Sequence, residues 1–377
     1  MRSTSSAATR ETCPVQNRPD HGTAVIVGAS LAGLMAALSL SRVGIRVTLL
    51  ERSDDSGRTG AALHVENGLL EKITGVKATE MQPLASGVQT WFTVHARLKA
   101  VVETDPNVRL HQQTSVQSVD QDASSAWAIT SDGRTFRGDI VVGADGHRSV
   151  VRPSVSPANP DATFAGYVIW LGLTPETAIP ARHAWPRDVA ILDDDDAYLL
   201  GYPLPGSDGA LQPGSRQLGW AWYDSSRNDL LRNQGSVVGN VVHHSLLPAE
   251  LPDEIIRELA DESCERWPAP WLDAILDCIK RRAIIGTPIA EYVPDQLVNG
   301  RLALIGDAAH VPTPMTGSGF SASMQDAVAL AESVSDGVRG SNAEVALRRY
   351  DARRLSSARQ LVLSGQQFSR TFSRRGR

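Results

Sequence analysis

The sequence has few of the features that mark secreted, membrane-spanning or nucleic-acid-binding proteins. Its three cysteines, Cys13, Cys264 and Cys278, are too few and too far apart for a disulfide framework or a CxxC redox pair. No apolar run reaches the roughly 18 residues of a membrane span, and residues 1–22 lack the apolar segment of a signal peptide. A net charge of -5 gives no electrostatic reason to expect nucleic acid or acidic lipid as a partner. We therefore expect a cytoplasmic protein whose residues 1–22 form a disordered leader.

The sequence does contain the alternating strands and helices of an α/β nucleotide-binding fold. A β-branched run at 24–28 ends in glycine and predicts a buried parallel strand. A Leu- and Ala-rich stretch predicts a helix over 31–43, and a second strand over 46–50 closes a βαβ unit. This alternation returns in later segments, with strands at 139–143 and 301–305 and helices over 91–104, from about 318, and over 343–368.

Residues 154–281 differ in composition from the segments that flank them. They hold six of the chain's 8 tryptophans and begin among prolines. Alternating strands are expected at 164–173, 197–203 and 217–223, and helices over 253–267 and 271–281. We therefore expect an inserted domain of β-sheet plus helices that binds substrate, made of residues 74–92 and 154–281. The Rossmann-like nucleotide-binding domain then comprises the remaining segments, 23–73, 93–153 and 282–377.

The first chemical motif is the turn Gly28-Ala-Ser-Leu-Ala-Gly33, a Rossmann fingerprint with Ser30 at the second glycine position. Gly28 permits the tight turn, and Gly33 allows helix and strand to pack closely. The small Ser30 still lets backbone amides approach a pyrophosphate at the helix N-terminus. Glu51 ends the second strand, where a carboxylate binds a ribose diol and repels a 2′-phosphate. The residues expected to contact the cofactor are Gly28, Ser30, Leu31, Ala32, Gly33, Glu51 and Arg52. A glycine-rich turn without a ligand is the alternative.

The second motif runs from Gly306 to Gly319 and reads GDAAHVPTPMTGSG. A strand delivers Asp307 into a loop whose prolines and glycines fix an unusual path into the following helix. Such a loop suits a polyol hydroxyl at Asp307 and an electron-rich flavin edge at the start of the helix. The alternative interpretation is that the prolines and glycines only shape an ordinary loop.

A third motif, Gly143-Ala-Asp-Gly-His-Arg-Ser-Val-Val-Arg152, completes a set that resembles the class A, single-component FAD-dependent aromatic hydroxylases, the family of para-hydroxybenzoate hydroxylase. The three motifs occur in the family's order and span nearly the whole chain. Residues 164–170 and 200–205 resemble the 2,6-dihydroxypyridine hydroxylase branch. The resemblance implies a Rossmann-like fold of the GR2 type with non-covalent FAD. A second fingerprint is missing from the sequence, which implies that NADH or NADPH binds only transiently.

The resemblance also assigns roles around the flavin. Asp307 would bind the ribityl chain of FAD. Pro314 would lie close to where the flavin C4a-hydroperoxide forms, with Gly317, Ser318 and Gly319 along the isoalloxazine. On the nucleotide side, the residues with implied roles are Asp145 and Gly146 near the pyrophosphate, Val116 at the adenine and Arg58 in the segment near the ring.

The sequence departs from the family pattern in two places. Many relatives carry arginine where we align His95, so either His95 or the neighbouring Arg97 makes that cofactor contact. An asparagine that often follows the last glycine is replaced by Phe320 and Ser321. His310, by contrast, matches a residue that is frequent at this position of the family motif. Its position predicts a structural role rather than a catalytic one.

The implied activity is a monooxygenase that consumes NAD(P)H and O₂ and hydroxylates an electron-rich hydroxylated aromatic or N-heteroaromatic molecule. Such an enzyme must exclude water and favour a deprotonated substrate. Tyr198 is our candidate for a substrate hydrogen bond, because its spacing from Tyr202 is similar to that of the substrate tyrosine in para-hydroxybenzoate hydroxylase. Packing in the core or at an interface is the alternative for Tyr198. We expect small-molecule partners, no metal ligands, and leave a homodimer open.

Two other classes of function remain open from the sequence. A flavin-dependent halogenase or epoxidase could share this fold, and Trp220-Ala-Trp222 is similar to the paired tryptophans of halogenases. The Ile-Pro that completes that signature is absent, since Tyr223 follows, and Lys77 would have to serve as the essential lysine. A non-enzymatic flavin-binding regulator would need no substrate cavity.

Overall fold

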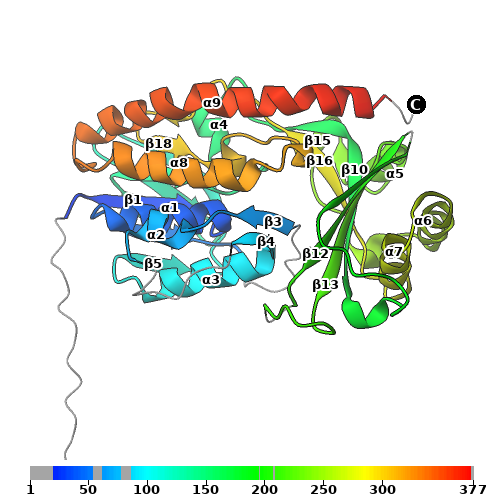
Figure 1. Ribbon diagram of the computed structural model, residues 1–377. Coiled ribbons are helices and arrows are strands. Elements are labelled where there is room, and N and C mark those ends of the chain that lie inside the picture. The colour runs from blue at the N-terminus through cyan, green and yellow to red at the C-terminus, as the bar shows by residue number, and fades with distance from the viewer. Residues whose placement is uncertain (1–19, 54–61, 78–85, 195, 207–208, 375–377) are drawn as a thin grey trace, which may run out of the picture.

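The computed structural model describes residues 20–53, 62–77, 86–194, 196–206 and 209–374. Two sheets lie side by side, and the long helix α9 (Asn342–Phe372) runs across both of them (Figure 1). The expected leader lies outside the described residues except for residues 20–22. Of these, His21 is tied to the fold by backbone hydrogen bonds with Gly44 and Val338.

The first sheet has six strands in the order β17-β18-β9-β1-β2-β5. Five of them run parallel: β1 (Thr23–Val27), β2 (Arg46–Leu50), β5 (Val108–His111), β9 (Ile140–Gly143) and β18 (Leu302–Leu304). The short β17 (Val298–Asn299) pairs antiparallel with β18. These strands are apolar along most of their length because both faces of the sheet are covered.

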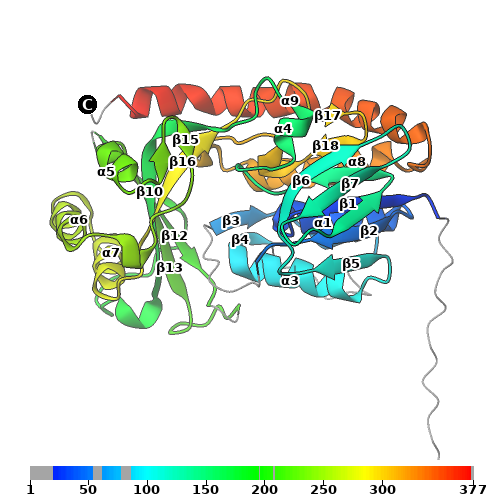
Figure 2. The same ribbon diagram turned by 180° about the vertical axis from the view of Figure 1, so that it is seen from behind.

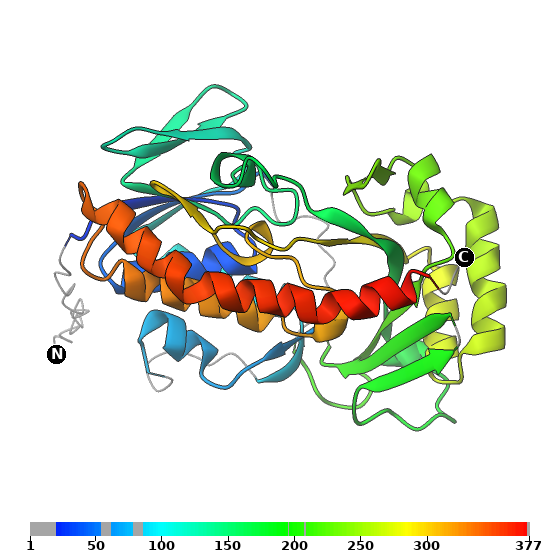
Figure 3. The same ribbon diagram turned by 90° about the horizontal axis from the view of Figure 1, so that it is seen from above.

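Helices cover one face of this sheet, and a small sheet covers the other. On the helical side lie α1 (Leu31–Arg42), α2 (Leu69–Thr74), α3 (Trp91–Thr104), α8 (Gly319–Ser333) and the first half of α9. The opposite face carries a three-stranded sheet of β6 (Val116–Gln121), β7 (Ala126–Thr130) and β8 (Thr135–Gly138), as Figures 2 and 3 show. The short α4 (Arg152–Val155) follows β9 and leads to the second sheet.

The second sheet is antiparallel and has seven strands. Its members are β10 (Thr163–Pro175), β11 (Ala190–Asp194), β12 (Ala197–Leu204), β13 (Gln217–Asp224), β14 (Val237–Val238), β15 (Val241–Val242) and β16 (Ile285–Glu291). Trp170, Trp220 and Trp222 project from one face into a core with α6 (Asp253–Arg266) and α7 (Trp271–Lys280). The other face carries Tyr167 and Tyr223 and packs against Phe368 and Phe372 of α9.

The observed elements correspond closely to those expected from the sequence, with three differences. First, β16 pairs with β10 of the second sheet, so the boundary expected at residue 282 does not coincide with the edge of that sheet. Second, several short elements were not expected, among them the antiparallel pair β3 (Ala62–Val65) and β4 (Gly87–Thr90), α2, α5 (Asn228–Asn233) and β11. Third, α9 continues to Phe372, four residues past its expected end. Within the described residues, no helix is both long and apolar enough to span a bilayer.

Candidate functional site

The turn between β1 and α1 forms a tight path that side chains would block. Gly28 has a φ of +99°, and a Cβ on it would lie 2.5 Å from the carbonyl oxygen of Ala144. A Cβ on Gly33 would lie 1.9 Å from the carbonyl oxygen of Gly28. Ser30 precedes α1 with an extended backbone, and its side chain makes no capping hydrogen bond. The amides at the start of α1 are therefore left for another acceptor, which an anionic ligand can supply.

A cavity of about 480 Å³ opens beside this turn. Seven of its lining residues were expected from the sequence: Gly28, Ser30, Glu51, Arg52, Val116, Asp145 and Gly146. The sequence did not indicate four polar residues that line it, namely Ser53, Thr114, Ser115 and Arg148. The size and polarity of this cavity fit a nucleotide.

Glu51 both shapes the turn and faces the cavity. Its Oε2 accepts a hydrogen bond from the amide of Ala29 at 2.7 Å, and its Oε1 accepts from Ser53 N and Oγ at 3.0 and 2.6 Å. Glu51 also lines the cavity wall, where a carboxylate can accept a hydrogen bond from a ribose hydroxyl. The buried Glu51 thus positions the Gly28–Gly33 turn as well as lining the nucleotide cavity.

The Asp145–Gly146 turn holds a buried acceptor that lacks a partner. Asp145 Oδ2 accepts from the amide of Val150 at 2.7 Å, whereas Oδ1 is buried and has no hydrogen-bond partner among the described residues. Burial raises the pKa of this carboxyl. Gly146 has a φ of +81° and faces open space. A cofactor hydroxyl or amide would satisfy the buried oxygen.

Arg152 joins this turn to the second motif. Its buried guanidinium donates to the carbonyl oxygens of His147 at 2.8 Å and Gly146 at 3.3 Å. It also donates to the carbonyl oxygens of Asp307 and Ala308, each at 2.8 Å. One side chain therefore fixes two loops that are about 160 residues apart in the sequence.

A buried ion cluster sets the Gly306–Asp307 turn. Asp326 of α8 accepts from the amide of Gly306 at 2.9 Å, from His310 Nε2 at 2.7 Å and from Arg354 Nε at 2.8 Å. Burial opposes ionisation of Asp326, but His310 and Arg354 outweigh it and hold its pKa below the ordinary value. Asp326 in turn raises the pKa of the buried His310. This geometry agrees with a structural role for His310.

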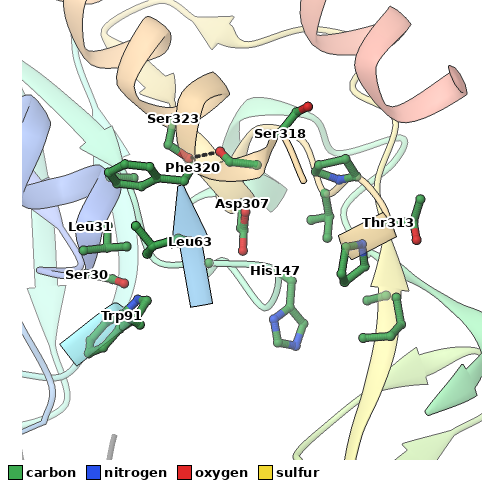
Figure 4. A pocket seen from close by; sticks show the side chains of 18 of the residues that line it. Ser30, Leu31, Leu63, Trp91, His147, Asp307, Thr313, Ser318, Phe320 and Ser323 are labelled. Atoms are coloured by element: carbon green, nitrogen blue, oxygen red, sulfur yellow. Dashed lines mark hydrogen bonds between the residues drawn. The ribbon is translucent and has the colours of Figure 1, made fainter. Parts of the chain in front are cut away.

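A second cavity, of about 410 Å³, continues from the first. The two share Ser30, Ala144 and Gly146 in their walls. Figure 4 shows Asp307 and His147 between the β1–α1 turn and Thr313. The expected cofactor residues in this wall are Ser30, Leu31, Ala32, Gly146, Asp307, Pro314, Gly317, Ser318 and Gly319. Its far end is closed by Thr287, Pro288, Ile289 and Ala290 of β16.

Of the expected site residues that the structure describes, Gly33, His95 and Tyr198 do not line these two cavities. His95 lies beneath the first turn, where its Nε2 is 3.0 Å from the carbonyl oxygen of Ala29 and its ring stacks on Trp91. Tyr198 packs against Phe368 and Phe372, with ring centroids 5.5 and 5.4 Å away, so its contact with substrate stays a prediction. Arg58 lies outside the described residues. The sequence did not indicate His147, which directly follows the Asp145–Gly146 turn, or β16, which reaches the cavity through its long-range pairing with β10.

The tryptophans that suggested a halogenase are core residues. Trp220 and Trp222 are buried, and Trp222 packs edge-to-face on Trp267 at 5.8 Å. They belong to the face of the second sheet that α6 and α7 cover. Lys77 is exposed and does not line either cavity. The features that favoured halogenation are therefore absent from the walls of these cavities.

Comparison with known families identifies the cofactor. One family, described as an FAD binding domain, matches residues 22–82 and 274–364, and a second, described as FAD binding domain-like, matches residues 164–279. The unpartnered Asp145 oxygen, the two glycine positions and the two connected cavities fit this cofactor.

Characterised relatives and solved structures are similar over most of the chain. The 2,6-dihydroxypyridine 3-monooxygenase of Paenarthrobacter nicotinovorans is 29% identical, covering 81% of this chain and 81% of the relative. An FAD-dependent urate hydroxylase of Mycolicibacterium vanbaalenii is 26% identical, covering 90% and 86%. The structure of 2,6-dihydroxypyridine-3-hydroxylase from Arthrobacter nicotinovorans has a TM-score of 0.77 at 24% identity, with 95% of this chain and 94% of that chain covered. Klebsiella pneumoniae HpxO, solved with FAD and uric acid, has a TM-score of 0.64 at 21% identity, covering 95% and 91%.

Proposed function

This chain is an FAD-dependent monooxygenase of the class A flavoprotein hydroxylases, and from that premise we propose that it hydroxylates a small, electron-rich ring. The ring would be a hydroxylated aromatic or an N-heteroaromatic compound of the hydroxypyridine kind. The observation that carries the proposal is the pair of connected cavities, which runs from Glu51 past Asp307 to the Pro314 loop and ends at β16.

Different residues along these cavities would bind different parts of the cofactor. Glu51 would hold the ribose, the start of α1 the pyrophosphate, and Asp307 the ribityl chain. Bound FAD would supply the redox chemistry, by accepting a hydride from NADH or NADPH and activating O₂ for transfer of one oxygen atom. The protein contributes binding, orientation and exclusion of water.

The ring end of the second cavity is suited to excluding water. The walls of the cavity are mostly apolar, with Leu63, Ile289, Val311, Pro312 and Phe320 among them. Thr313 is fully buried, and its Oγ1 lies 2.6 Å from the hydroxyl of Tyr167. This pairing fixes the residue before Pro314. A reactive oxygen species held at such a wall would be protected from loss to water.

The substrate class rests on chemistry and on the relatives. Electrophilic oxygen transfer requires a ring that donates electrons, and hydroxyl groups supply that donation. The similar proteins are named for hydroxylation of 2,6-dihydroxypyridine, urate and 3-hydroxybenzoate, all of them small rings with oxygen substituents. We extend this class, rather than any single compound, to the present chain.

The test is oxidation of NADH and of NADPH by FAD-loaded protein across a panel of rings. The panel contains 2,6-dihydroxypyridine, urate and 3-hydroxybenzoate, with benzoate as a matched control that lacks the hydroxyl. We expect slow oxidation without a ring, strong stimulation by at least one hydroxylated ring, and no stimulation by benzoate. Equal rates with and without every ring would contradict the proposed function.

A further inference from the structure

The side chain of His147 ends in the second cavity without a partner. It follows the Asp145–Gly146 turn and lines the same cavity as Asp307 (Figure 4). Its Nε2 is buried and has no hydrogen-bond partner among the described residues. A buried polar atom that has lost water and gained nothing is destabilising. The missing partner is therefore expected to come from the molecule that fills the cavity.

The backbone of His147 is fixed at the junction of the two cavities. Arg152 donates to its carbonyl oxygen at 2.8 Å and to that of Gly146 at 3.3 Å. Gly146 lies in the walls of both cavities, as does Ser30 at the start of α1. The middle of a dinucleotide that spans both cavities, where its phosphates lie, must pass this junction.

Burial, with help from three arginines, favours the neutral form of the imidazole before a ligand binds. Burial lowers the pKa of His147, Asp307 opposes that effect, and Arg148, Arg152 and Arg52 lower the pKa further. A pyrophosphate carries two negative charges, and its arrival at this junction would favour the imidazolium form instead. A charged hydrogen bond to phosphate is also stronger than a neutral one.

We propose that His147 is a ligand of FAD that binds the anionic pyrophosphate-to-ribityl segment as an imidazolium, so that FAD binding takes up a proton. The inference rests on FAD being the cofactor and does not depend on hydroxylation. His147 is then a cofactor ligand in addition to those implied by the three sequence motifs.

The sign of the pH dependence follows from this coupling. The pKa of His147 is higher in the complex than in the free protein, so FAD affinity is greatest at pH values below the free-protein pKa. Affinity declines as the pH rises through that interval and levels off above the pKa of the complex. A rise of one pKa unit corresponds to about a tenfold change in affinity.

The experiment measures the Kd of FAD for the apoprotein by quenching of flavin fluorescence, from about pH 5.5 to about pH 8.5, the range in which histidine titrates. The variants are His147→Gln, which cannot be protonated in this range, and His244→Gln, an exposed histidine outside both cavities. We expect wild-type affinity to fall about tenfold across the range and His244→Gln to follow it. His147→Gln is expected to bind more weakly at low pH and to show no such decline.

Calorimetry of FAD binding to the wild-type protein, in buffers with different ionisation enthalpies, measures the proton uptake directly. Proton uptake below neutral pH supports the inference even where a variant folds poorly. Two results would overturn it: wild-type binding without proton uptake, or a His147→Gln protein whose FAD affinity keeps the wild-type pH dependence. The measurements contain no NAD(P)H, O₂ turnover or ring substrate, so a failure of hydroxylation would be a separate result.

Discussion

At the scale of single residues, Asp307 and Arg152 have complementary tasks at the junction of the cavities. Arg152 is 1% exposed and binds only backbone carbonyl oxygens there. Asp307, by contrast, has its backbone held by Arg152 while its side chain faces the cavity. The carboxylate is therefore available to a ligand without being needed to hold the loop.

Replacing Asp307 by alanine should weaken FAD binding without unfolding the protein. The change removes the partner of a buried ligand hydroxyl, a loss of about 1–3 kcal/mol, or roughly tenfold or more in Kd. Fluorescence titration of FAD measures the effect. Asp336→Ala is the matched control, because Asp336 is an exposed aspartate paired with Arg349. Equal FAD affinity in the Asp307→Ala and control proteins would show that Asp307 does not contact FAD.

The sequence predicted the cavity residues that belong to local motifs and missed those that long-range packing brings in. Glu51 and Val116 line the nucleotide cavity as expected, since a strand end or a short turn sets their positions. His95 was expected at the cofactor, but a helix register alone does not show that Nε2 reaches the Ala29 carbonyl oxygen. His147 was missed because its nearness to Asp307, which lies 160 residues away in the sequence, has no local signal.

At the scale of elements, a buried polar network connects the Pro314 loop to the end of α9. Thr313 and the hydroxyl of Tyr167 on β10 lie 2.6 Å apart, and Tyr167 also interacts with Ser369 of α9. Ser369 Oγ donates to Glu291 Oε1 of β16 at 2.6 Å. Burial raises the pKa of Tyr167 to about 12 and raises that of Glu291. Burial outweighs the hydrogen bond from Ser369, which favours the ionised carboxylate, so the pKa of Glu291 is higher in the folded protein.

Glu291 should make stability fall as the pH rises. Its pKa is higher in the folded than in the unfolded chain, so its contribution is complete below the ordinary value of about 4.3. That contribution is lost as the pH rises through the folded pKa. Thermal unfolding of FAD-saturated protein across the acid range should show the stability of wild type relative to Glu291→Gln declining as the pH rises.

The matched control for Glu291 is Glu344→Gln, since Glu344 is partly exposed and paired with Arg348 on the surface of α9. The control should keep the wild-type pH dependence. Parallel curves for wild type and Glu291→Gln would mean that Glu291 titrates normally in the fold.

Elements with strong periodicity were predictable, whereas short pairings were not. The parallel strands and long helices carry continuous apolar patterns, and they were found to within a few residues. β16 interrupts such a pattern with Pro288, and only its pairing with β10 shows that it belongs to the second sheet. The β3–β4 pair joins segments separated by more than 20 residues. The sequence therefore contains no short hairpin turn that would predict this pair.

At the scale of the whole molecule, the second cavity is built where the two sheets meet. α9 has 31 residues, a length of about 46 Å at the rise of an α-helix, and it packs on α8 at one end and on β10 at the other (Figure 3). Arg152, α9 and the Tyr167–Thr313 contact together fix the second sheet against the FAD-binding sheet. The wall facing the Pro314 loop is therefore held in place by residues from well-separated parts of the chain.

The central claim is that this molecule transfers one oxygen atom from O₂ to a hydroxylated ring. The most direct test incubates FAD-loaded protein with NADH or NADPH, isotopically labelled O₂ and each stimulating ring from the panel, and measures product mass. We expect a product that gains one labelled oxygen atom and forms without halide. A product whose added oxygen comes from water, or one that carries a halogen, would contradict it.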